Sequence, residues 1–318
     1  MKLYRRLALA ASAVALLATA ACGGDSLEGS DDPTATSGGE EKGSLTLGGQ
    51  DFTEMQIMAA MYEKVLSNDG YDVDTKLVTT RDVYIGELSK GSVDVVPDYL
   101  AGITDYLNTA KNGDKADSVS TNDPQTTLDA LEPLAEEQNI SMLEPSQATD
   151  QNAFITTKDY ADANALTSLS DVGALGQPIK LAAPSDCEGR SDCEAGLTGV
   201  YGIDISQIVP LDFASSQMKD ALTSGEVQLG ETGTTDGTLD QLGLVLLEDD
   251  KGIQPAQNLI PAVNSDFLAD NPDVADILNE LSSTLTTEDL ATMNAKVDLE
   301  RQKPEDVATD YLTDKGLI

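Results

Sequence analysis

The sequence predicts an α/β protein in which strands and helices alternate and the sheets are mostly parallel. Short runs of β-branched and other apolar residues recur from residue 44 to residue 247, and most of them are followed by an amphipathic stretch. The chain has 318 residues, of which about 275 follow a polar N-terminal segment. This length is enough for one large or two medium domains with a hydrophobic core.

The order of these runs along the chain gives the predicted elements. A strand over SLTLGG is followed by a helix that begins near Thr53, where Met55 and Met58 recur at helical spacing. A second helix is predicted over 81–90, and the chain is predicted to be entirely helical from about Asp270. The predicted strands are residues 44–49, 73–78, 93–96, 153–157, 179–183, 207–211, 226–229 and 244–247.

The first 21 residues predict a secretory signal peptide. Lys2, Arg5 and Arg6 precede an apolar run that ends at Ala21 and is followed directly by Cys22. The run is too short for a membrane span, which needs about 20 apolar residues. The Thr-Ala-Ala-Cys site resembles a bacterial lipobox, in which the cysteine becomes the lipidated first residue of the mature protein. We therefore expect Cys22 to carry lipid; the alternative is an ordinary signal peptide with an incidental cysteine.

Residues 22–43 are predicted to form a lipidated, disordered tether, because Gly, Ser, Thr, Asp and Glu cannot bury enough apolar surface to fold. The tether is expected to hold the folded part away from the membrane. We therefore expect an exported protein at the outer face of the cytoplasmic membrane, attached through its lipid only.

The composition excludes several classes of function. The chain has no histidine, which rules out Ser-His-Asp and Cys-His catalysis and every His-ligated metal site. Its formal net charge of −37 would repel nucleic acid. An enzyme would need a pair of carboxylates as acid and base, and no spacing marks out such a pair. We expect no catalytic residue, no metal and no cofactor.

Two cysteines remain once Cys22 is set aside. Cys187 and Cys193 are separated by five residues in DCEGRSDC, and outside the cytosol a disulfide is the default state of such a pair. The alternative, a metal site with two thiolates, has no other soft ligand to complete it. The disulfide is expected to order the loop that carries Arg190.

The chain contains one internal similarity. ELSKGSVDVVPDY, ending at Tyr99, and ALTSGEVQLGETG, ending at Gly233, align when Gly91 is laid on Gly225. Each segment predicts a helix end, a glycine turn and a short strand, which suggests two similar lobes. Ligands of open α/β sheets bind beyond the carboxyl ends of the strands, so Tyr99 and Gly233 are predicted to face a shared cleft.

Seven short motifs, in order from Leu45 to Pro261, resemble one protein family. They are LTLGGQDFTEM (45–55), GSVDVVPDYLAG (91–102), PSDCEGRSD (184–192), VYGI (200–203), TTDG (234–237), LVLLEDD (244–250) and NLIP (258–261). The chain is similar to the binding proteins of osmoprotectant ABC importers, which take up glycine betaine, choline, carnitine and related compounds.

The resemblance implies a type II periplasmic-binding-protein fold with two α/β lobes, a ligand cleft and two hinge crossovers. Lobe one would be residues 44–151 plus 255–318, and lobe two residues 152–254. The implied function is to deliver a small polar or zwitterionic solute to an ABC permease and its ATPase, as a monomer and without chemistry of its own. The alternative is a lipoprotein that senses a ligand in the same cleft without transport.

The resemblance also implies a binding site, which this chain changes. Tyr99 falls on the first tyrosine of the family's aromatic box, but the other three box positions are Asn152, Gly233 and Gln257. Arg190 falls on the arginine that pairs with a ligand carboxylate. Gln50 stands where some members have a ligand-binding lysine, and Gly102 stands at a family threonine. The full predicted set is Gln50, Asp51, Thr53, Tyr99, Asn152, Arg190, Gly233, Thr234 and Gln257.

Two interpretations of these changes stay open. The site is rebuilt for a more polar solute through amides, hydroxyls and Arg190, or other tyrosines such as Tyr84 and Tyr106 restore the box. The first interpretation predicts a solute with an anionic group for Arg190 and weak binding of glycine betaine. A quaternary ammonium cannot donate hydrogen bonds to the amides of Asn152 and Gln257.

Overall fold

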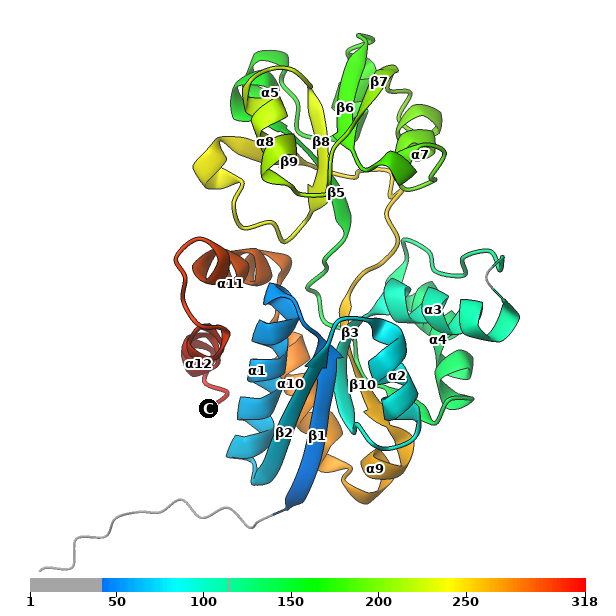
Figure 1. Ribbon diagram of the computed structural model, residues 1–318, viewed down its shortest axis with the longest axis vertical. Helices are drawn as coiled ribbons and strands as arrows, with labels where there is room; N and C mark the ends of the chain where they lie inside the picture. Colours follow the sequence, from blue (N-terminus) through cyan, green and yellow to red (C-terminus); the bar gives the residue numbers. More distant parts are fainter. Residues whose placement is uncertain (1–41, 114) are drawn as a thin grey trace, which may run out of the picture. The chain divides into compact units, whose positions relative to one another are not determined.

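The computed structural model describes residues 42–113 and 115–318, which form two five-stranded sheets (Figure 1). The expected signal peptide, the expected lipidation site Cys22 and most of the expected tether lie outside these residues. The first sheet has the order β2-β1-β3-β10-β4, and its strands are β1 (Gly43–Gln50), β2 (Tyr71–Val78), β3 (Val95–Tyr99), β4 (Ile140–Met142) and β10 (Leu259–Asn264). The second sheet has the order β7-β6-β8-β5-β9, and its strands are β5 (Asn152–Thr157), β6 (Ile179–Ala183), β7 (Ile205–Pro210), β8 (Leu229–Gly233) and β9 (Leu244–Leu247).

In each sheet four of the five strands run in one direction and one runs against them, so the sheets are mostly parallel, as expected, with β10 and β5 as the exceptions. In the first sheet β1 pairs in parallel with β2 and β3, whereas β10 pairs antiparallel with β3 and β4. In the second sheet β6 pairs in parallel with β7 and β8, whereas β5 pairs antiparallel with β8 and β9. The reason lies in the connectivity, because β5 and β10 each enter a sheet directly after the chain has left the other one, and so run against its parallel strands.

Helices cover both faces of the first sheet (Figure 1). α1, α10, α11 and α12 share one hydrophobic cluster with β1, and α2, α3 and α4 share another. These helices are α1 (Thr53–Asn68), α2 (Arg81–Ser89), α3 (Leu100–Asn112), α4 (Pro124–Glu136), α9 (Ser265–Asp270), α10 (Asp273–Thr284), α11 (Thr287–Asp298) and α12 (Pro304–Lys315). The predicted helix start at Thr53 and the helical C-terminal stretch are confirmed.

Shorter helices accompany the second sheet, and its core is divided between its two faces. They are α5 (Lys158–Asn164), α6 (Leu169–Ala174), α7 (Glu194–Gly199) and α8 (Ser216–Thr223), with 3-10 turns η1 (Ser185–Cys187) and η2 (Asp240–Leu242). Within the described part of the chain, none of the helices combines the length and the apolar character that crossing a bilayer requires.

The strand predicted over 226–229 was wrong in position, because β8 covers Leu229–Gly233. The predicted run lies on the turn after α8, where Gly225 has a φ of +77°. The strand itself reads LGETG, which has little β-propensity, yet all five of its residues are buried. A Cβ at Gly230 would lie 2.2 Å from the sulfur of Met218 and 2.9 Å from Leu222 Cδ1, so a larger residue would force these side chains of α8 to move.

The two sheets repeat one arrangement, as the internal similarity predicted. β3 and β8 are the central strands of their sheets, and each follows a helix and a glycine of positive φ, +72° at Gly91 and +77° at Gly225. Tyr99 and Gly233 are the last residues of these two strands. In the antiparallel register Gly233 lies opposite Asn152, and Tyr99 lies opposite Leu259.

Candidate functional site

A cavity of about 420 Å³ is lined by the end of β8, by the loops that follow β7 and β8, and by residues of helices. The start of α1 and the helix α11 contribute to it, together with the first crossover segment and the loop that follows β8. Its lining residues are Phe52, Thr53, Glu54, Asp150, Phe213, Ala214, Lys219, Gly233, Thr235, Asp236, Gly237, Thr238, Asn294 and Asp298.

The N-terminus of α1 opens onto this cavity without a side-chain cap. Phe52 is the N-cap residue and accepts no capping hydrogen bond, since its side chain is a phenyl ring that is 39% exposed. The Thr53 hydroxyl donates to Asp298 Oδ1 at 2.7 Å instead of turning back to the helix. The first amides of α1 therefore offer donors, reinforced by the helix dipole, to a polar or anionic oxygen of a solute.

A buried hydrogen-bond network centres on Glu54, which is 2% exposed. Tyr99 donates its hydroxyl to Glu54 Oε1 at 2.5 Å. Asn294 donates its amide to Glu54 Oε2 at 2.8 Å and to the carbonyl of Thr235 at 3.2 Å. Tyr99, the one box tyrosine that the resemblance retains, is thus 7% exposed and lies behind the cavity as the partner of an acid.

The space at Gly233 is taken by two other side chains. A Cβ at this position would lie 2.8 Å from Asp150 Oδ1 and 3.8 Å from Phe213 Cζ. Asp150 Oδ1 also accepts a hydrogen bond from Thr235 at 3.0 Å. The ring of Phe213, 44% exposed, therefore stands close to where the family's third tyrosine would project.

The cavity is strongly acidic. It contains four carboxylates, Glu54, Asp150, Asp236 and Asp298, and Lys219 is the only cation among its described lining residues. Lys219 is already bound to Asp236 at 2.6 Å. The remaining negative charge, with the aromatic faces of Phe52 and Phe213, favours a cationic group.

Burial sets the ionisation of these acids. It raises the pKa of Asp150 to about 7, with a further increase from the charge of Glu54. It also raises the pKa of Glu54, against the hydrogen bonds from Tyr99 and Asn294. Burial acts on Asp236 as well, but hydrogen bonds from Lys219, Thr238 and Thr232 hold the pKa of Asp236 below its ordinary value.

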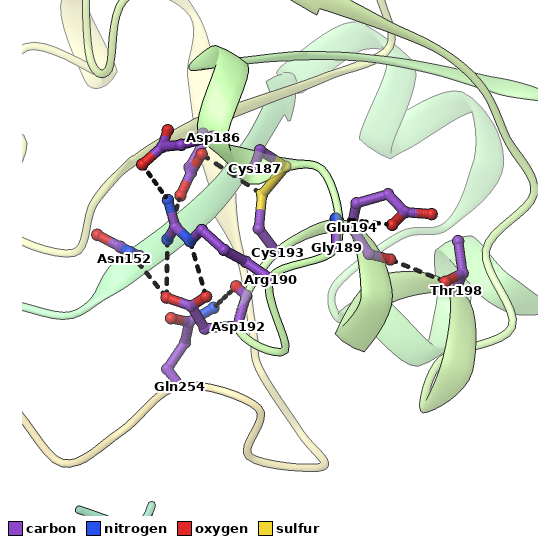
Figure 2. The surroundings of a disulfide bond; sticks show 11 residues. Asn152, Asp186, Cys187, Gly189, Arg190, Asp192, Cys193, Glu194, Thr198 and Gln254 are labelled. Atoms are coloured by element: carbon purple, nitrogen blue, oxygen red, sulfur yellow. Dashed lines mark hydrogen bonds and ion pairs between the residues drawn. A yellow bond between two sulfur atoms is a disulfide. The ribbon is translucent and has the colours of Figure 1, made fainter. Parts of the chain in front are cut away.

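The predicted disulfide is present between Cys187 and Cys193, and Arg190 lies inside the loop that it closes (Figure 2). Figure 2 shows the Arg190 guanidinium surrounded by acids rather than free for a solute. It donates to Asp192 at 2.9 and 2.7 Å and to Glu231 Oε1 at 3.3 Å. A solute carboxylate would have to displace these partners.

The same loop touches both crossover segments. Asn152, at the start of β5, donates to Asp192 Oδ2 at 3.4 Å. Gln254, on the way to β10, donates to the Asp192 carbonyl at 2.7 Å. Burial raises the pKa of Glu231 to about 7 although Arg190 lies beside it. The loop therefore connects the disulfide with the two segments that join the sheets.

Cys187, Cys193 and Glu231 lie as close together as the ligands of a metal site, with their potential ligand atoms within 4.8 Å of one another. The disulfide removes both thiolates, which are the metal-binding form of cysteine. The donor set of this cluster therefore does not suit a metal ion.

The other predicted residues do not gather in the 420 Å³ cavity. Asn152 and Thr234 line a separate cavity of about 560 Å³ with an apolar floor that includes Phe154 and Leu247. Gln257 Oε1 accepts the Gly102 amide at 3.0 Å. A Cβ at Gly102 would lie 2.7 Å from Arg81 Nη2, so a threonine here would require the end of the Arg81 side chain to move.

Gln50 ends β1 half-buried, and Asp51 is exposed and accepts from Gln56 at 2.7 Å. Tyr84 is buried and donates to Asp98 at 2.6 Å, and Tyr106 packs against the same hydrophobic cluster. These two tyrosines are therefore parts of the core and do not replace the box.

Of the fourteen lining residues, only Thr53 and Gly233 were predicted, and the twelve that sequence reasoning missed include Phe52, Glu54, Asp150, Phe213 and Asn294. Phe52 and Glu54 lie inside the LTLGGQDFTEM motif, next to the predicted Asp51 and Thr53, so that motif was a usable signal. Asp150 precedes Asn152 by two residues. Phe213 and Asn294 lie in no motif, and only folding brings them to the site.

Three comparisons with known proteins all find similarity to glycine-betaine-binding proteins. Residues 43–314 match the family described as the substrate-binding domain of ABC-type glycine betaine transport systems. A glycine-betaine-binding protein of Pseudomonas aeruginosa is 25% identical over 283 residues, 86% of this chain and 88% of the relative. The glycine betaine-binding protein YehZ of Escherichia coli is 26% identical over 282 residues, 86% and 90% of the two chains. The apo structure of YehZ superposes with a TM-score of 0.73 at 25% identity over 86% of this chain and 99% of that one.

Proposed function

Since the chain belongs to the family of substrate-binding domains of ABC-type glycine betaine transport systems, we propose that it binds a small cationic or zwitterionic osmoprotectant in the 420 Å³ cavity. The protein is a solute-binding component of such an importer and not an enzyme by family. The observation that supports the proposed site is that three features line one cavity. They are the N-terminus of α1, which has no side-chain cap, two exposed phenylalanines, and more carboxylates than cations.

The two ends of a zwitterion suit two parts of the cavity. Its cationic end would lie by Asp150 between Phe52 and Phe213, where opposite charge and aromatic faces both favour it. Its oxygen-bearing end would lie at the first amides of α1, near Thr53.

The predicted residues outside the cavity keep a different proposed role. Residues 44–151 plus 255–318 and residues 152–254 would act as two lobes, and the strands of each sheet fall within one of these divisions. Closure of the lobes would bring Asn152, Thr234 and Gln257, which flank the crossovers, onto the solute. Arg190 would meet an anionic group only after releasing Asp192.

The partners follow from the family. We propose that the protein is anchored through Cys22 at the outer face of the cytoplasmic membrane and hands its solute to a permease and its ATPase as a monomer. A ligand sensor with the same cleft is the second candidate. An adjacent permease gene and ATPase gene favour transport, and their absence favours sensing.

A thermal-shift screen of the mature protein tests the binding function. The panel contains glycine betaine, choline, carnitine, ergothioneine, amino acids and polyols. We expect saturable stabilisation by at least one cationic or zwitterionic compound, since a ligand that binds only the folded state raises the melting temperature. Stabilisation by polyols or acidic amino acids alone would refute the proposed site.

A further inference from the structure

The hydrogen bonds of the first crossover change from one proposed lobe to the other between two neighbouring residues. The Asp150 amide donates to the Gln257 carbonyl at 3.1 Å, which ties Asp150 to the segment that leads into β10. The Gln151 amide donates to the Thr234 hydroxyl at 3.0 Å, and the Thr234 amide donates to the Gln151 carbonyl at 2.9 Å. Gln151 is therefore tied to lobe two, which places the first hinge between Asp150 and Gln151.

The second crossover changes from one lobe to the other at Pro255. Gln254 is tied to lobe two, because its amide donates to Asp249 Oδ2 at 2.8 Å. Ala256 is tied to lobe one, because its amide donates to the Thr121 carbonyl at 2.8 Å. A hinge motion needs changes in the backbone angles of only a few such residues. The two crossovers therefore allow lobe two to rotate as one body.

A third contact joins the lobes outside both crossovers, between helix α11 and the loop that follows β8. A Cβ at Gly237 would lie 2.3 Å from the Ala291 carbonyl oxygen and 2.7 Å from the Ala295 amide nitrogen. The glycine therefore lets the loop lie directly on the backbone of the helix. Beside this contact, Asn294 donates its side-chain amide to the Thr235 carbonyl at 3.2 Å.

The two sides of this contact are anchored in different lobes. Leu290 and Met293 of α11 are buried in the hydrophobic cluster around α1, which belongs to lobe one. The loop follows directly from Gly233 at the end of β8, the central strand of lobe two. A rigid rotation leaves in place only the atoms on its axis, which runs through the two crossovers. Closure of the lobes therefore moves the loop relative to α11.

The contact is present while the cavity is open to solvent, since its lining residues Phe52 and Phe213 are 39% and 44% exposed. We propose that the contact between α11 and the loop at Gly237 is a latch, which holds the two lobes in this open arrangement and releases when they close. This inference rests on the proposed function, because it assumes that the lobes close on a solute. The latch lowers affinity, because it reduces the population of the closed arrangement.

The distance between two spin labels tests the latch without any solute. Val119→Cys labels lobe one and Val200→Cys labels lobe two, and both valines are exposed and lie outside the cavity lining. In Cys22→Ser protein the labels meet no other free thiol, because the remaining two cysteines form the disulfide. The distribution of distances between the labels then reports the arrangement of the lobes.

Gly237→Ala and Ala295→Leu each insert atoms between the loop and the helix, and Ala295 lies outside the cavity lining. Both variants should shift and broaden the distribution of distances. Gly86→Ala, at a position where a Cβ meets no atom within 4 Å, is the matched control and should leave the distribution unchanged. Distributions in both latch variants that equal the distribution of the wild type would overturn the inference.

A cross-link tests whether the latch must release. Gly237→Cys combined with Ala295→Cys places two Cβ atoms in contact, and a shift of about 1 Å brings them to the separation found in disulfides. The cross-linked protein should bind choline and glycine betaine about tenfold more weakly than the wild type or worse. Its radius of gyration in small-angle scattering should also no longer decrease when either compound is added. The two single-cysteine variants, which cannot form the bond, are the controls and should still contract.

Weakening the latch should have the opposite effect on binding. Ala295→Leu should bind the two compounds about fivefold more tightly than the wild type, because the hydrogen bond and the packing of the latch no longer oppose closure. Wild-type affinity and contraction in the cross-linked protein would mean that closure leaves the contact intact, and would overturn the inference while leaving the binding function in place. Absence of choline and glycine betaine binding by the wild type would instead contradict the proposed function, and the spin-label distances would still decide whether the latch exists.

Discussion

Arg190 and Asp192 form a two-bond ion pair inside the disulfide loop, with Nε donating to Oδ1 at 2.9 Å and Nη2 donating to Oδ2 at 2.7 Å. The carbonyl of Asp192 also accepts from Gln254 at 2.7 Å, so the ion pair is tied to the second crossover segment. The loop between Cys187 and Cys193 is therefore hydrogen-bonded to the segment through which the chain returns to the first sheet.

Reduction of the Cys187–Cys193 disulfide should weaken solute binding more than it weakens the fold. A short loop constrains little of the unfolded chain, so we expect a loss of about 2 kcal/mol in the free energy of unfolding. The larger effect should fall on affinity, because Asp192 loses its fixed position against Asn152 and Gln254. Calorimetry and urea denaturation with and without reductant measure the two effects. Unchanged affinity in the reduced protein would contradict this role of the loop.

Arg190→Ala should destabilise the protein in a pH-dependent way. At pH 8 the variant leaves Glu231, which is 1% exposed, without its cation, and we expect a loss of about 2 kcal/mol. At pH 5.5 the loss should be smaller, because Glu231 has a pKa of about 7 and is then protonated. Lys158→Ala, which breaks an exposed pair with Asp162, is the control and should cost less than about 0.5 kcal/mol. An equal loss of free energy of unfolding at both pH values would contradict the raised pKa of Glu231.

Much of the fold was predictable because the spacing of apolar residues along the chain indicates which segments form helices and which form strands. The helix start at Thr53 and the strands 179–183 and 244–247 match the structure. β8 could not be found this way, since it reads LGETG, and the lack of a side chain at Gly230 reflects its contact with Met218 and Leu222 of α8. β10 was missed although all of its residues are buried, because it follows the second crossover rather than a predicted helix. Such strand positions depend on contacts that are distant in sequence.

Phe213→Ala should lower solute affinity with little change in stability. The ring is 44% exposed and close to Gly233, so its loss removes a cation–π contact worth on the order of 1 to 2 kcal/mol, or about tenfold in affinity. The free energy of unfolding should change by less than about 0.5 kcal/mol. Val200→Ala, at a similarly exposed apolar position, is the control for both measurements. Full affinity in Phe213→Ala would remove this ring from the site.

The ligand-free protein should become less stable as pH rises from about 5 to 7. Burial raises the pKa values of Asp150 and Glu231 to about 7, and it raises that of Glu54 as well. In this pH range the folded state keeps protons that the unfolded state releases. Each of these acids therefore lowers the free energy of unfolding by up to about 1.4 kcal/mol for every pH unit, and the decrease stops once the pH exceeds its pKa in the folded state. Urea denaturation at four pH values measures the slope, which Asp150→Asn should reduce. A free energy of unfolding that increases with pH over this range would contradict the raised pKa values of the buried acids.

The binding site was less predictable than the fold. Of the residues that the motifs predicted, Thr53 and Gly233 line the cavity that we propose as the site. The motifs could not show that the Arg190 guanidinium is already paired with Asp192, since an ion pair between residues so close in sequence depends on the geometry of their loop. Nor could they show that Phe213 occupies the space near Gly233, because the ring comes from a loop that resembles no motif.

The central claim is that the solute lies in the cavity between Phe52 and Phe213, and tryptophan fluorescence tests it most directly. The chain contains no tryptophan, so Phe213→Trp introduces a single reporter that retains an aromatic face at the site. Titration with the solute found by the thermal-shift screen should change its emission with the same dissociation constant that calorimetry gives. The same titration of Val200→Trp, at an exposed position outside the cavity lining, should leave the emission unchanged. Saturable binding by calorimetry without any change in the emission of Phe213→Trp would place the solute elsewhere and contradict the account.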